Sequence, residues 1–338
     1  MRKRTRYSLL AVALLLLGLA AVVYLRQQAP PEVARLLPES DAIVYLNLKP
    51  LREATHFDGN PVTRSPAYQQ FIDATGIVAE RDLDRAAFAL HRMADPTGPN
   101  GAVAFSEVFE GHFDSARLTG YLAANAKAQD SYAGRTIYSL ASENRTVRIV
   151  LLAYDTVAAS NMPTPEQIHS IIDRQKAAAS PFSGSSLLET RYKDVPPFAL
   201  AWGIGHLGFP LSSTGGQHRD IHLLGLDLPL PADSTYVASL RLTGDLEDGL
   251  HLPGGQVALR VDEIASNAVE AAQTAQTLTS MVNLLRAVEL ARQPVPVAAQ
   301  DKVLRQFSDS IKIVGRGDRA SLTAAIPVSS LRQLANRP

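Results

Sequence analysis

The sequence contains no cysteine among its 338 residues. Without cysteine the protein forms no disulfide, no iron–sulfur cluster, no thiolate zinc site and no thiol nucleophile. It also has no excess of either charge, because 33 lysines and arginines balance 33 aspartates and glutamates. A neutral chain lacks the basic surface that nucleic-acid binding usually needs, so we expect no nucleic-acid partner.

Several motifs of nucleotide-binding and hydrolytic enzymes are absent. Neither GxxxxGK[ST] nor G-x-S-x-G occurs in the sequence. Residues 203–208 (GIGHLG) match GxGxxG, but the sequence FPLSS that follows has no helical period. Because the third glycine of a dinucleotide site must begin a helix whose amides hold the pyrophosphate, we interpret these glycines as turn residues.

A long hydrophobic run stands near the N-terminus. Residues 7–25 are nineteen consecutive residues without a charge. As a helix they would span about 28 Å, close to the thickness of a bilayer's hydrocarbon core. The basic residues Arg2, Lys3, Arg4 and Arg6 precede the run, and only Arg26 follows it closely. The positive-inside rule therefore predicts a cytoplasmic tail at 1–6, a transmembrane helix at 7–25 and a periplasmic C-terminal domain.

A cleaved signal peptide is the alternative to this anchor. Its apolar core is usually about 7–15 residues long and ends in an A-x-A-like site. Here the run leads into Arg26-Gln27-Gln28 without such a site, which favours an uncleaved anchor. Residues 1–26 hold five basic and no acidic residues, so the remainder has a net charge of −5. We therefore expect the inner membrane to be contacted through residues 7–25 alone.

The rest of the chain divides by composition. Residues 26–36 contain the stiff pair Pro30-Pro31 and predict a short linker. Residues 207–229 are rich in glycine, serine and histidine without a clear period, and predict a loop between two halves. The two folded units are therefore expected at residues 37–206 and 230–338.

Turn signals and alternating apolar residues predict mostly hairpins. Ser65-Pro66 and Asp114 begin predicted helices over residues 66–75 and about 115–127, because serine and aspartate are N-cap residues and proline favours the first helical position. A third helix is predicted over residues 163–178, with Ile168, Ile171 and Ile172 on one face. The predicted strands are residues 42–48, 85–93, 101–109, 135–140, 147–153, 156–160 and 198–204, then 235–242, 254–261, 309–315 and 319–326.

The second unit contains a long predicted helix over residues 262–292. Its apolar residues follow a heptad spacing, at Ile264, Ala268, Ala271, Ala275, Leu278, Val282 and Leu285. Such a stripe is typical either of a helix that pairs with a second protein or of one that packs on its own sheet. We favour packing on the sheet, because alanine dominates the first half of the stripe. A terminal helix is expected at residues 329–335.

Hairpins imply antiparallel pairing, so we expect an α+β fold of two sheets, each with helices on one face, in a split β-α-β arrangement. LPESDAIV at 37–44 is echoed by LPADSTYV at 230–237, and GAVAF at 101–105 by GQVAL at 255–259. These echoes raise the hypothesis that the two units are a degenerate duplication, with chance similarity as the alternative.

Candidate reactive residues are sparse. His218, Asp220 and His222 are the densest potential metal ligands, but they fall in the predicted loop, without a helix to align an HxxxH pair. The serine-rich residues 180–186 are typical of a loop, and Trp202 in its apolar strand is typical of a core residue. We therefore predict no catalytic, cofactor-binding or metal-binding residue.

Two further features of the sequence bear on function, a glycosylation sequon and a set of acidic residues. Asn144-Arg145-Thr146 is formally a glycosylation sequon, but the anchor and the lack of cysteine favour a bacterial envelope, where we expect no glycan. No pair of carboxylates stands out at a catalytic spacing. Folding can still bring together the acidic residues Asp82, Asp84, Glu107 and Glu110.

Residues 155–197 carry a resemblance. The segments TVAASN at 156–161, IIDRQ at 171–175, PF at 181–182 and SLL at 186–188 occur in this order. They resemble a family of uncharacterised bacterial proteins with one N-terminal membrane segment and an extracytoplasmic α+β region. The similarity would cover most of residues 35–330. It implies location and fold class, and no activity or site residues.

Three functions fit the sequence to different degrees. The first is a non-enzymatic, membrane-anchored envelope protein that binds a ligand or a protein partner, and it needs no catalytic residues. The second is an inner-membrane component of a secretion or pilus-type assembly, which rests on analogy of layout alone. The third is an exported hydrolase, which would need His, Asp and Ser side chains gathered in a pocket.

The predicted topology can be tested with a reporter fused after residue 40. We expect activity from a reporter that works only outside the cytoplasm, such as alkaline phosphatase, because residues 7–25 carry the chain across the membrane. A cytoplasmic reporter at the same position should be inactive. Activity of the cytoplasmic reporter would contradict the topology.

Overall fold

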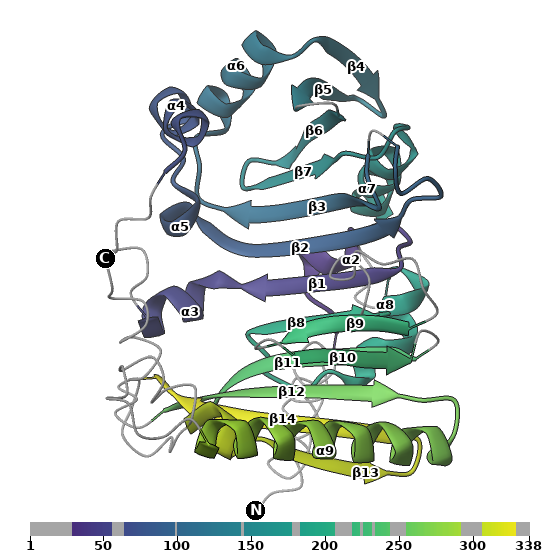
Figure 1. Cartoon of the computed structure of the whole chain (residues 1–338). Helices are drawn as coiled ribbons and strands as arrows, with labels where there is room; N and C mark the ends of the chain where they lie inside the picture. The colour runs from purple at the N-terminus through teal and green to yellow at the C-terminus, as the bar shows by residue number, and fades with distance from the viewer. Residues whose placement is uncertain are drawn as a thin grey trace, which may run out of the picture.

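In the computed structural model, the described residues are 29–55, 64–98, 100–142, 145–177, 183–206, 218–223, 226–231, 234–243, 255–291 and 306–328. Twelve strands form one continuous antiparallel sheet (Figure 1). From edge to edge these strands are β13 (Lys312–Arg316), β14 (Arg319–Pro327), β12 (Gln256–Ile264), β11 (Thr235–Thr243), β8 (Ala201–Gly205), β1 (Ala42–Asn47), β2 (Leu83–Arg92), β3 (Val103–Gly111), β7 (Thr156–Ser160), β6 (Arg145–Ala153), β5 (Arg135–Ser142) and β4 (Ala128–Tyr132).

The α+β class and the antiparallel pairing predicted from the sequence are confirmed. The prediction of two separate sheets is wrong, because β8 pairs with β1 on one side and with β11 on the other. Each half on its own would end in an unpaired strand at this point. Pairing through β8 removes both edges and leaves a single sheet.

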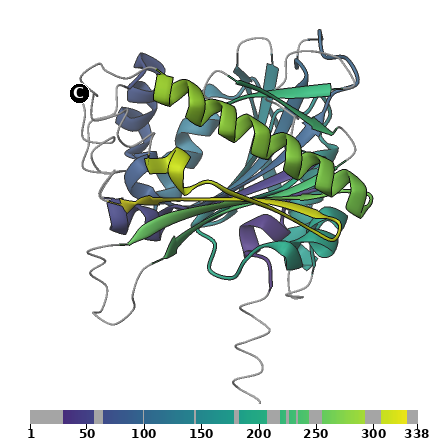
Figure 2. The same ribbon diagram turned by 60° about the horizontal axis from the view of Figure 1, so that its bottom comes forward.

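The helices divide between the two faces of the sheet (Figure 2). On one face, called here the α2 face, lie α2 (Glu32–Arg35), α7 (Glu166–Ala177) and α8 (Ser186–Arg191). On the opposite α9 face, α4 (Pro66–Thr75) and α6 (Ser115–Asn125) cover β5, β6 and β7, while α9 (Ala268–Ala291) covers β13 and β14. The short helical elements include α3 (Leu48–Thr55), α5 (Ala79–Asp82), the 3₁₀ turn Tyr192–Asp194 and a helical turn at residues 306–310.

The main core lies on the α2 face. Ile168, Ile171 and Ile172 of α7 are fully buried there, as the sequence predicted. Val33 and Ala34 of α2 are also buried in this core. The expectation that residues 26–36 form an extended linker is therefore wrong from residue 32 onward, since this segment forms a helical turn that packs on the sheet.

Capping residues set the helix starts. Ser65 Oγ accepts a hydrogen bond from the Tyr68 amide at the start of α4, and Asp114 accepts two from the first turn of α6, so both predicted N-caps are confirmed. The long helix α9 starts at residue 268 rather than 262. Strand β12 continues to Ile264, and Asn267 then caps the helix through the amides of residues 269 and 270.

The heptad stripe of α9 packs on its own sheet. Ala271 and Ala275 are buried, and an added Cβ on Gly315 of β13 would lie 3.3 Å from the Ala275 side chain. The small residues let helix and sheet approach closely. The preference for sheet packing is thus confirmed for this part of the stripe, whereas Ile264, the first stripe residue, lies in a strand.

Some elements differ from the sequence prediction. Strand β4 was not predicted, because AQDSY is polar and lacks the β-branched residues that mark strands. Within the predicted loop 207–229, β9 (His218–Leu223) pairs with β10 (Leu226–Pro231) as a separate two-stranded hairpin, so that prediction is wrong. The predicted terminal helix 329–335 lies outside the described residues. Among the described helices none is long and apolar enough to cross a membrane, and residues 7–25 also lie outside the described residues.

The two halves of the sheet share a connection pattern. In each, a hairpin (β2–β3 or β11–β12) leads into a helix, and a later hairpin (β6–β7 or β13–β14) places its last strand beside the first hairpin. The first half has two additional strands, β4 and β5, between its helix and β6. The echo GAVAF/GQVAL falls at the starts of the corresponding strands β3 and β12, whereas the other echo falls at β1 and β11, which do not correspond. Duplication remains a hypothesis.

Glycine at the end of β8 is required by its surroundings. Gly205 has φ 145°, and an added Cβ would lie 2.5 Å from the Ala42 Cβ of β1. We predict that Gly205→Ala lowers the free energy of unfolding by about 2 to 4 kcal/mol, because the backbone strain and the clash both act at the strand that joins the halves. Urea unfolding of the full chain measures this change.

Gly120→Ala is the matched control for this prediction. Gly120 is exposed on α6, and an added Cβ would meet nothing within 4 Å. Alanine there should raise stability by up to about 1 kcal/mol, because it restricts the unfolded chain. Equal effects of the two substitutions would contradict a special role for Gly205.

Candidate functional site

Three of the four carboxylates singled out in the sequence are neutralised by neighbours. The pairs are Asp82 with Arg81 at 2.6 Å, Asp84 with Arg52 at 2.7 Å and with His112 at 3.0 Å, and Glu110 with Arg85 at 2.8 Å. Although burial raises the pKa of Asp82, hydrogen bonds from the Arg81 side chain and the Val78 amide bring it below its ordinary value. These three side chains therefore have structural roles.

Glu107 differs from the other three. It lies in the middle of β3, where Ala104, Ser106 and Val108 are buried on the α2 face and the alternate residues from 103 to 109 are half-buried on the α9 face. Among the described residues, no hydrogen bond or ion pair is found for its carboxyl group. Glu107 thus places an unpaired carboxyl on the α9 face of the sheet.

The surroundings of Glu107 are apolar. The residues directly opposite it are Phe88 of β2 and Ala159 of β7. Phe105 and Phe109 lie two residues away on the same face of β3, and the rings of Phe88 and Phe109 meet edge to face with centroids 5.7 Å apart. We call the surface formed by Val44, Phe88, Leu90, Phe105, Phe109 and Glu107 the Glu107 face.

Burial among these side chains raises the pKa of Glu107 to about 7. Desolvation is the only cause, since no cation or hydrogen-bond donor among the described residues stabilises the charged form. The carboxyl is therefore half-protonated near neutral pH. It can donate a hydrogen bond when protonated and attract a donor or a cation when ionised.

None of the described helices covers the Glu107 face. Of the helices that contact β1 and β2, α2 and α8 lie on the opposite face. Helix α3 follows β1, and its Arg52 reaches Glu80 of α5 and the start of β2, at Leu83 and Asp84. The six side chains of the Glu107 face are accordingly half-buried rather than buried, as expected for a surface that can receive a ligand.

The sequence contains a signal for this site that composition alone does not show. In VAFSEVF at 103–109, glutamate stands between two phenylalanines with the same parity, at a position where the alternation predicts an apolar residue. The sequence alone does not separate Glu107 from Asp82, Asp84 and Glu110. The ion pairs of Asp84 and Glu110 depend on contacts between distant segments, and adjacency in the sequence does not show that Arg81 folds back onto Asp82.

Histidine and serine do come together at another place. His91 Nε2 lies 3.0 Å from Ser106 Oγ, which in turn lies 3.0 Å from Ser160 Oγ. Ser106 is 0% exposed, so a substrate does not reach its hydroxyl, and burial lowers the pKa of His91. This chain of side chains links β2, β3 and β7 inside the α2 face and has a structural role.

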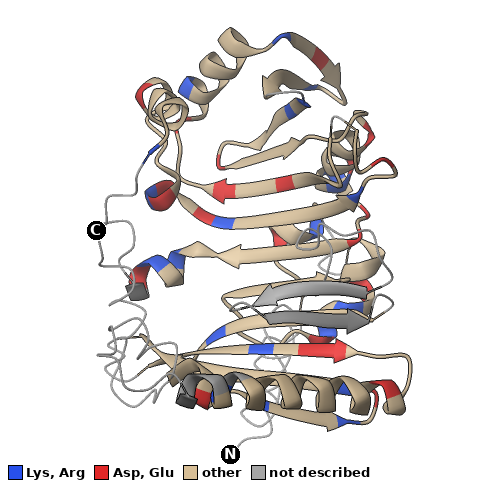
Figure 3. Ribbon diagram, in the orientation of Figure 1, with Lys and Arg blue, Asp and Glu red and all other residues tan. Residues whose placement is uncertain are grey.

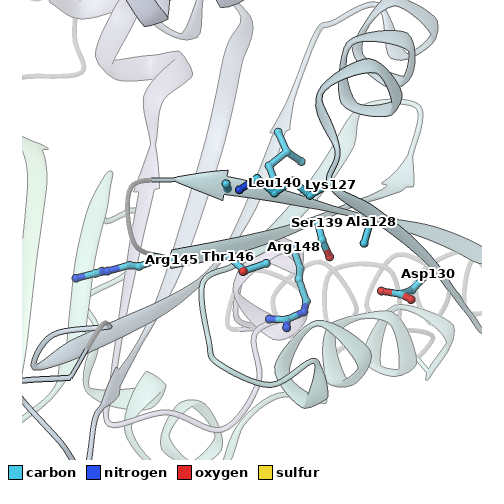
Figure 4. Close-up of a pocket in the computed structure, with 9 residues that line it drawn as sticks. Lys127, Ala128, Asp130, Ser139, Leu140, Arg145, Thr146 and Arg148 are labelled. Atoms are coloured by element: carbon cyan, nitrogen blue, oxygen red, sulfur yellow. The ribbon is translucent and has the colours of Figure 1, made fainter.

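Two open hollows lie near the β4 end of the sheet. The first, of 470 Å³, is lined by Lys127 and by residues of β4, β5 and β6, including Asp130, Arg145 and Arg148 (Figure 4). The guanidinium of Arg148 already donates to the carbonyls of Met162 and Pro163 before α7. The second, of 850 Å³, lies between α6 and β6, and its Arg135 donates to the Leu151 carbonyl. Arg148 and Arg135 therefore hold protein backbone.

The other residues considered in the sequence have varied positions. Gly203 and Gly205 lie within β8 and not in a turn, so the turn interpretation is wrong for them. Ser185 caps α8, and Ser186 Oγ donates to Glu39, so these serines of the predicted loop organise a helix start. Trp202 is buried and stacks on Tyr45, which confirms its core role.

The predicted histidine cluster lies in an unexpected element. His218, Asp220 and His222 belong to β9, and their side chains are outside the described part of the structure, as is Asn144. In the part of the chain that the structure does describe, no three histidine, aspartate or glutamate side chains group closely enough to hold a metal ion.

Comparison with known proteins gives only distant structural similarity. No family model matches the chain, and no curated protein matches it. Among solved structures, crystal form III of TP0453 is similar with a TM-score of 0.45 and 11% identity, covering 91% of this chain and 99% of that one. Crystal form I has a TM-score of 0.41 at 10% identity, covering 90% and 96% of the two chains, and form IV has 0.37 at 12%, covering 91% and 97%.

The raised pKa of Glu107 makes stability depend on pH. Between about pH 4.5 and 7 the folded protein holds a proton on Glu107 that the unfolded chain releases. The contribution of Glu107 to the free energy of unfolding is therefore fully present below pH 4.5 and is lost as pH rises through 7. Titration of Glu107 should lower the free energy of unfolding of the wild type by about 3 kcal/mol between pH 4.5 and 7, and we predict that Glu107→Gln lacks this decrease. Urea unfolding of both proteins across this pH range measures the difference.

Glu110→Gln is the control for this titration. Glu110 is on the same strand but is paired with Arg85 on the opposite face, so this variant should keep the wild-type decline between pH 4.5 and 7. A Glu107→Gln variant whose stability follows the same pH curve as wild type would contradict the raised pKa.

Proposed function

We propose that this protein is a single-pass, membrane-anchored, extracytoplasmic binding protein of the bacterial envelope. Its N-terminus is cytoplasmic, residues 7–25 are the anchor, and the folded domain is periplasmic. The function is non-enzymatic: the Glu107 face binds a small molecule with an apolar body and one hydrogen-bond donor or cationic group.

The observation that carries this proposal is the unpaired carboxyl at the centre of an apolar surface. Burying a carboxyl among apolar groups costs free energy unless it gains a partner. A protein that only needed a stable sheet would be more stable with an apolar residue at position 107. A ligand that supplies a donor to Glu107 recovers this cost while its apolar part covers the phenylalanines.

The chemistry of Glu107 indicates which polar groups the ligand carries. Above pH 7 the carboxyl is mostly ionised, so an ammonium group gives both a hydrogen bond and an ion pair. A hydroxyl group can bind at any pH, because it donates to the ionised form and accepts from the protonated form. A ligand carboxylate is disfavoured above pH 7 by repulsion.

Titration of the full chain in amphipol with 1-hexylamine, 1-hexanol and hexanoate tests the proposal. These ligands share a six-carbon chain and differ only in the polar group. At pH 8 we expect hexylamine to bind more tightly than hexanol, and hexanol more tightly than hexanoate, with the amine preference at least about tenfold, or 1.4 kcal/mol. Isothermal titration calorimetry measures the three affinities.

Two variants locate the binding. Glu107→Gln should lose the preference for the amine while it still binds hexanol, because the amide keeps hydrogen bonding but has no charge. Glu110→Gln should behave as wild type, since its carboxylate lies on the opposite face with Arg85. No binding of any of the three ligands, or an amine preference that persists in Glu107→Gln, would refute the proposed function.

A further inference from the structure

The sheet ends at β13, which carries an exposed stripe. Strand β13 pairs with β14 on one side and with no other strand among the described residues. Lys312, Val314 and Arg316 alternate on the α2 face and are exposed, and Val314 is 58% exposed. An exposed edge strand with an apolar residue in its centre is a site where a further strand can add.

Backbone groups of β13 are directed outward. Arg316 and Arg319 flank the two-residue turn Gly317-Asp318 and form the pair that closes the hairpin. The closing pair of a two-residue hairpin turn is a hydrogen-bonded pair, and hydrogen-bonded and non-hydrogen-bonded pairs then alternate along the two strands. The N–H and C=O groups of Ile313 and Gly315 therefore point away from β14, where an added strand would meet them.

The charges of β13 select the partner. Lys312 and Arg316 stand at the two ends of the strand, which carries no acidic residue (Figure 3). No ion pair is found for either side chain among the described residues. A partner strand with acidic residues at both ends and an apolar residue between them would match both charges and cover Val314.

A second copy of the protein does not fit this edge. In antiparallel pairing of two β13 strands centred on Val314, Lys312 of each copy would face Arg316 of the other, and in parallel pairing each basic residue would face its own kind. Like charges directly opposite each other destabilise a strand pair. The same charges discourage unspecific association and favour an acidic strand.

The other edge of the sheet has a different character. Strand β4 is also exposed, but its sequence AQDSY carries Asp130 and no large exposed aliphatic residue. Its Tyr132 stacks on His169 of α7 with ring centroids 3.8 Å apart and donates to Asp173. This edge lacks the basic-apolar-basic pattern of β13 and provides a comparison within the same molecule.

We propose that β13 is a docking edge for an extended peptide segment of a protein partner with the pattern acidic-x-apolar-x-acidic, which adds to the sheet as an antiparallel strand. The docking edge is separate from the Glu107 face, so the proposal for one surface can be correct even if the proposal for the other is refuted. Backbone hydrogen bonds to Ile313 and Gly315 supply affinity, and the contacts to Lys312, Val314 and Arg316 supply specificity.

Fluorescence anisotropy of the full chain with labelled peptides tests this proposal. The core sequences are Glu-Thr-Val-Thr-Glu, its charge-reversed form Lys-Thr-Val-Thr-Lys, and Glu-Pro-Val-Pro-Glu, which lacks the two amides that would pair with β13. We expect the first peptide to bind at least tenfold more tightly than the other two, and more weakly as salt rises.

A charge exchange shows whether the binding occurs at β13. The double variant Lys312→Glu with Arg316→Glu should lose at least tenfold in affinity for the acidic peptide and gain affinity for the basic one. Gain of binding cannot result from misfolding, so the basic peptide keeps the test decisive. The control double variant Lys127→Glu with Arg145→Glu, at the opposite end of the sheet, should keep the wild-type preference.

Three outcomes would overturn the proposal. One is equal binding of the acidic and basic peptides to the wild-type chain. Another is undiminished binding of the proline peptide, which would show that no strand is added. The third is a concentration-dependent dimer in sedimentation that Val314→Asp abolishes, which would identify a second copy as the occupant of this edge.

Discussion

The pairing of β8 with both β1 and β11 is the interaction on which the rest of the structure depends. Val44 of β1 and Ala238 of β11 lie on either side of Gly203, and Gly205 permits the close approach at the end of the strand. On the α2 face, Trp202 of β8 stacks on Tyr45 and meets Tyr192 edge to face. These contacts convert two half-sheets into one surface.

A continuous sheet has two faces, and the helices do not cover them equally. The α2 face receives α2, α7 and α8, which bury Val33 and Ala34, then Ile168, Ile171 and Ile172, and Leu188, respectively. The α9 face is covered towards its two ends, by α4 and α6 over β5–β7 and by α9 over β13 and β14. The Glu107 face lies between these helices because the halves are joined, which relates the architecture directly to the proposed binding surface.

The two proposed surfaces use different physical chemistry. On the Glu107 face, apolar side chains raise the pKa of a carboxyl to about 7, so a small ligand is selected by its donor group. At β13 the backbone supplies the hydrogen bonds, and Lys312 and Arg316 select the charge of a peptide. One surface is in the interior of the sheet and the other at its edge, so each can be occupied without the other.

Local features of the fold could be predicted from the sequence. Ser65, Asp114 and the hairpin at residues 85–109 act through neighbouring residues, and the structure confirms them. The pairing of β8 with two distant strands could not be predicted, because apolar alternation gives the faces of a strand but not its partners. For the same reason one sheet was mistaken for two.

The candidate site could likewise be predicted only in its local features, and not in its long-range contacts. The sequence identifies Glu107 as a glutamate between two phenylalanines, but only the folded chain shows that Asp82, Asp84 and Glu110 have cationic partners while no such partner is found for Glu107 among the described residues. Strand β4 and helix α2 were missed because a polar strand and a single helical turn carry no period that a sequence pattern can detect.

The central claim is that Glu107 is an unpaired carboxyl held in apolar surroundings, and its titration tests this most directly. The side-chain carboxyl carbon can be followed by carbon-13 NMR of the full chain labelled on glutamate, with Glu107→Gln identifying the signal. The account predicts a midpoint near pH 7, about where burial sets the pKa. A midpoint at the ordinary value of 4.5 would show that the group is solvated, and would contradict the account.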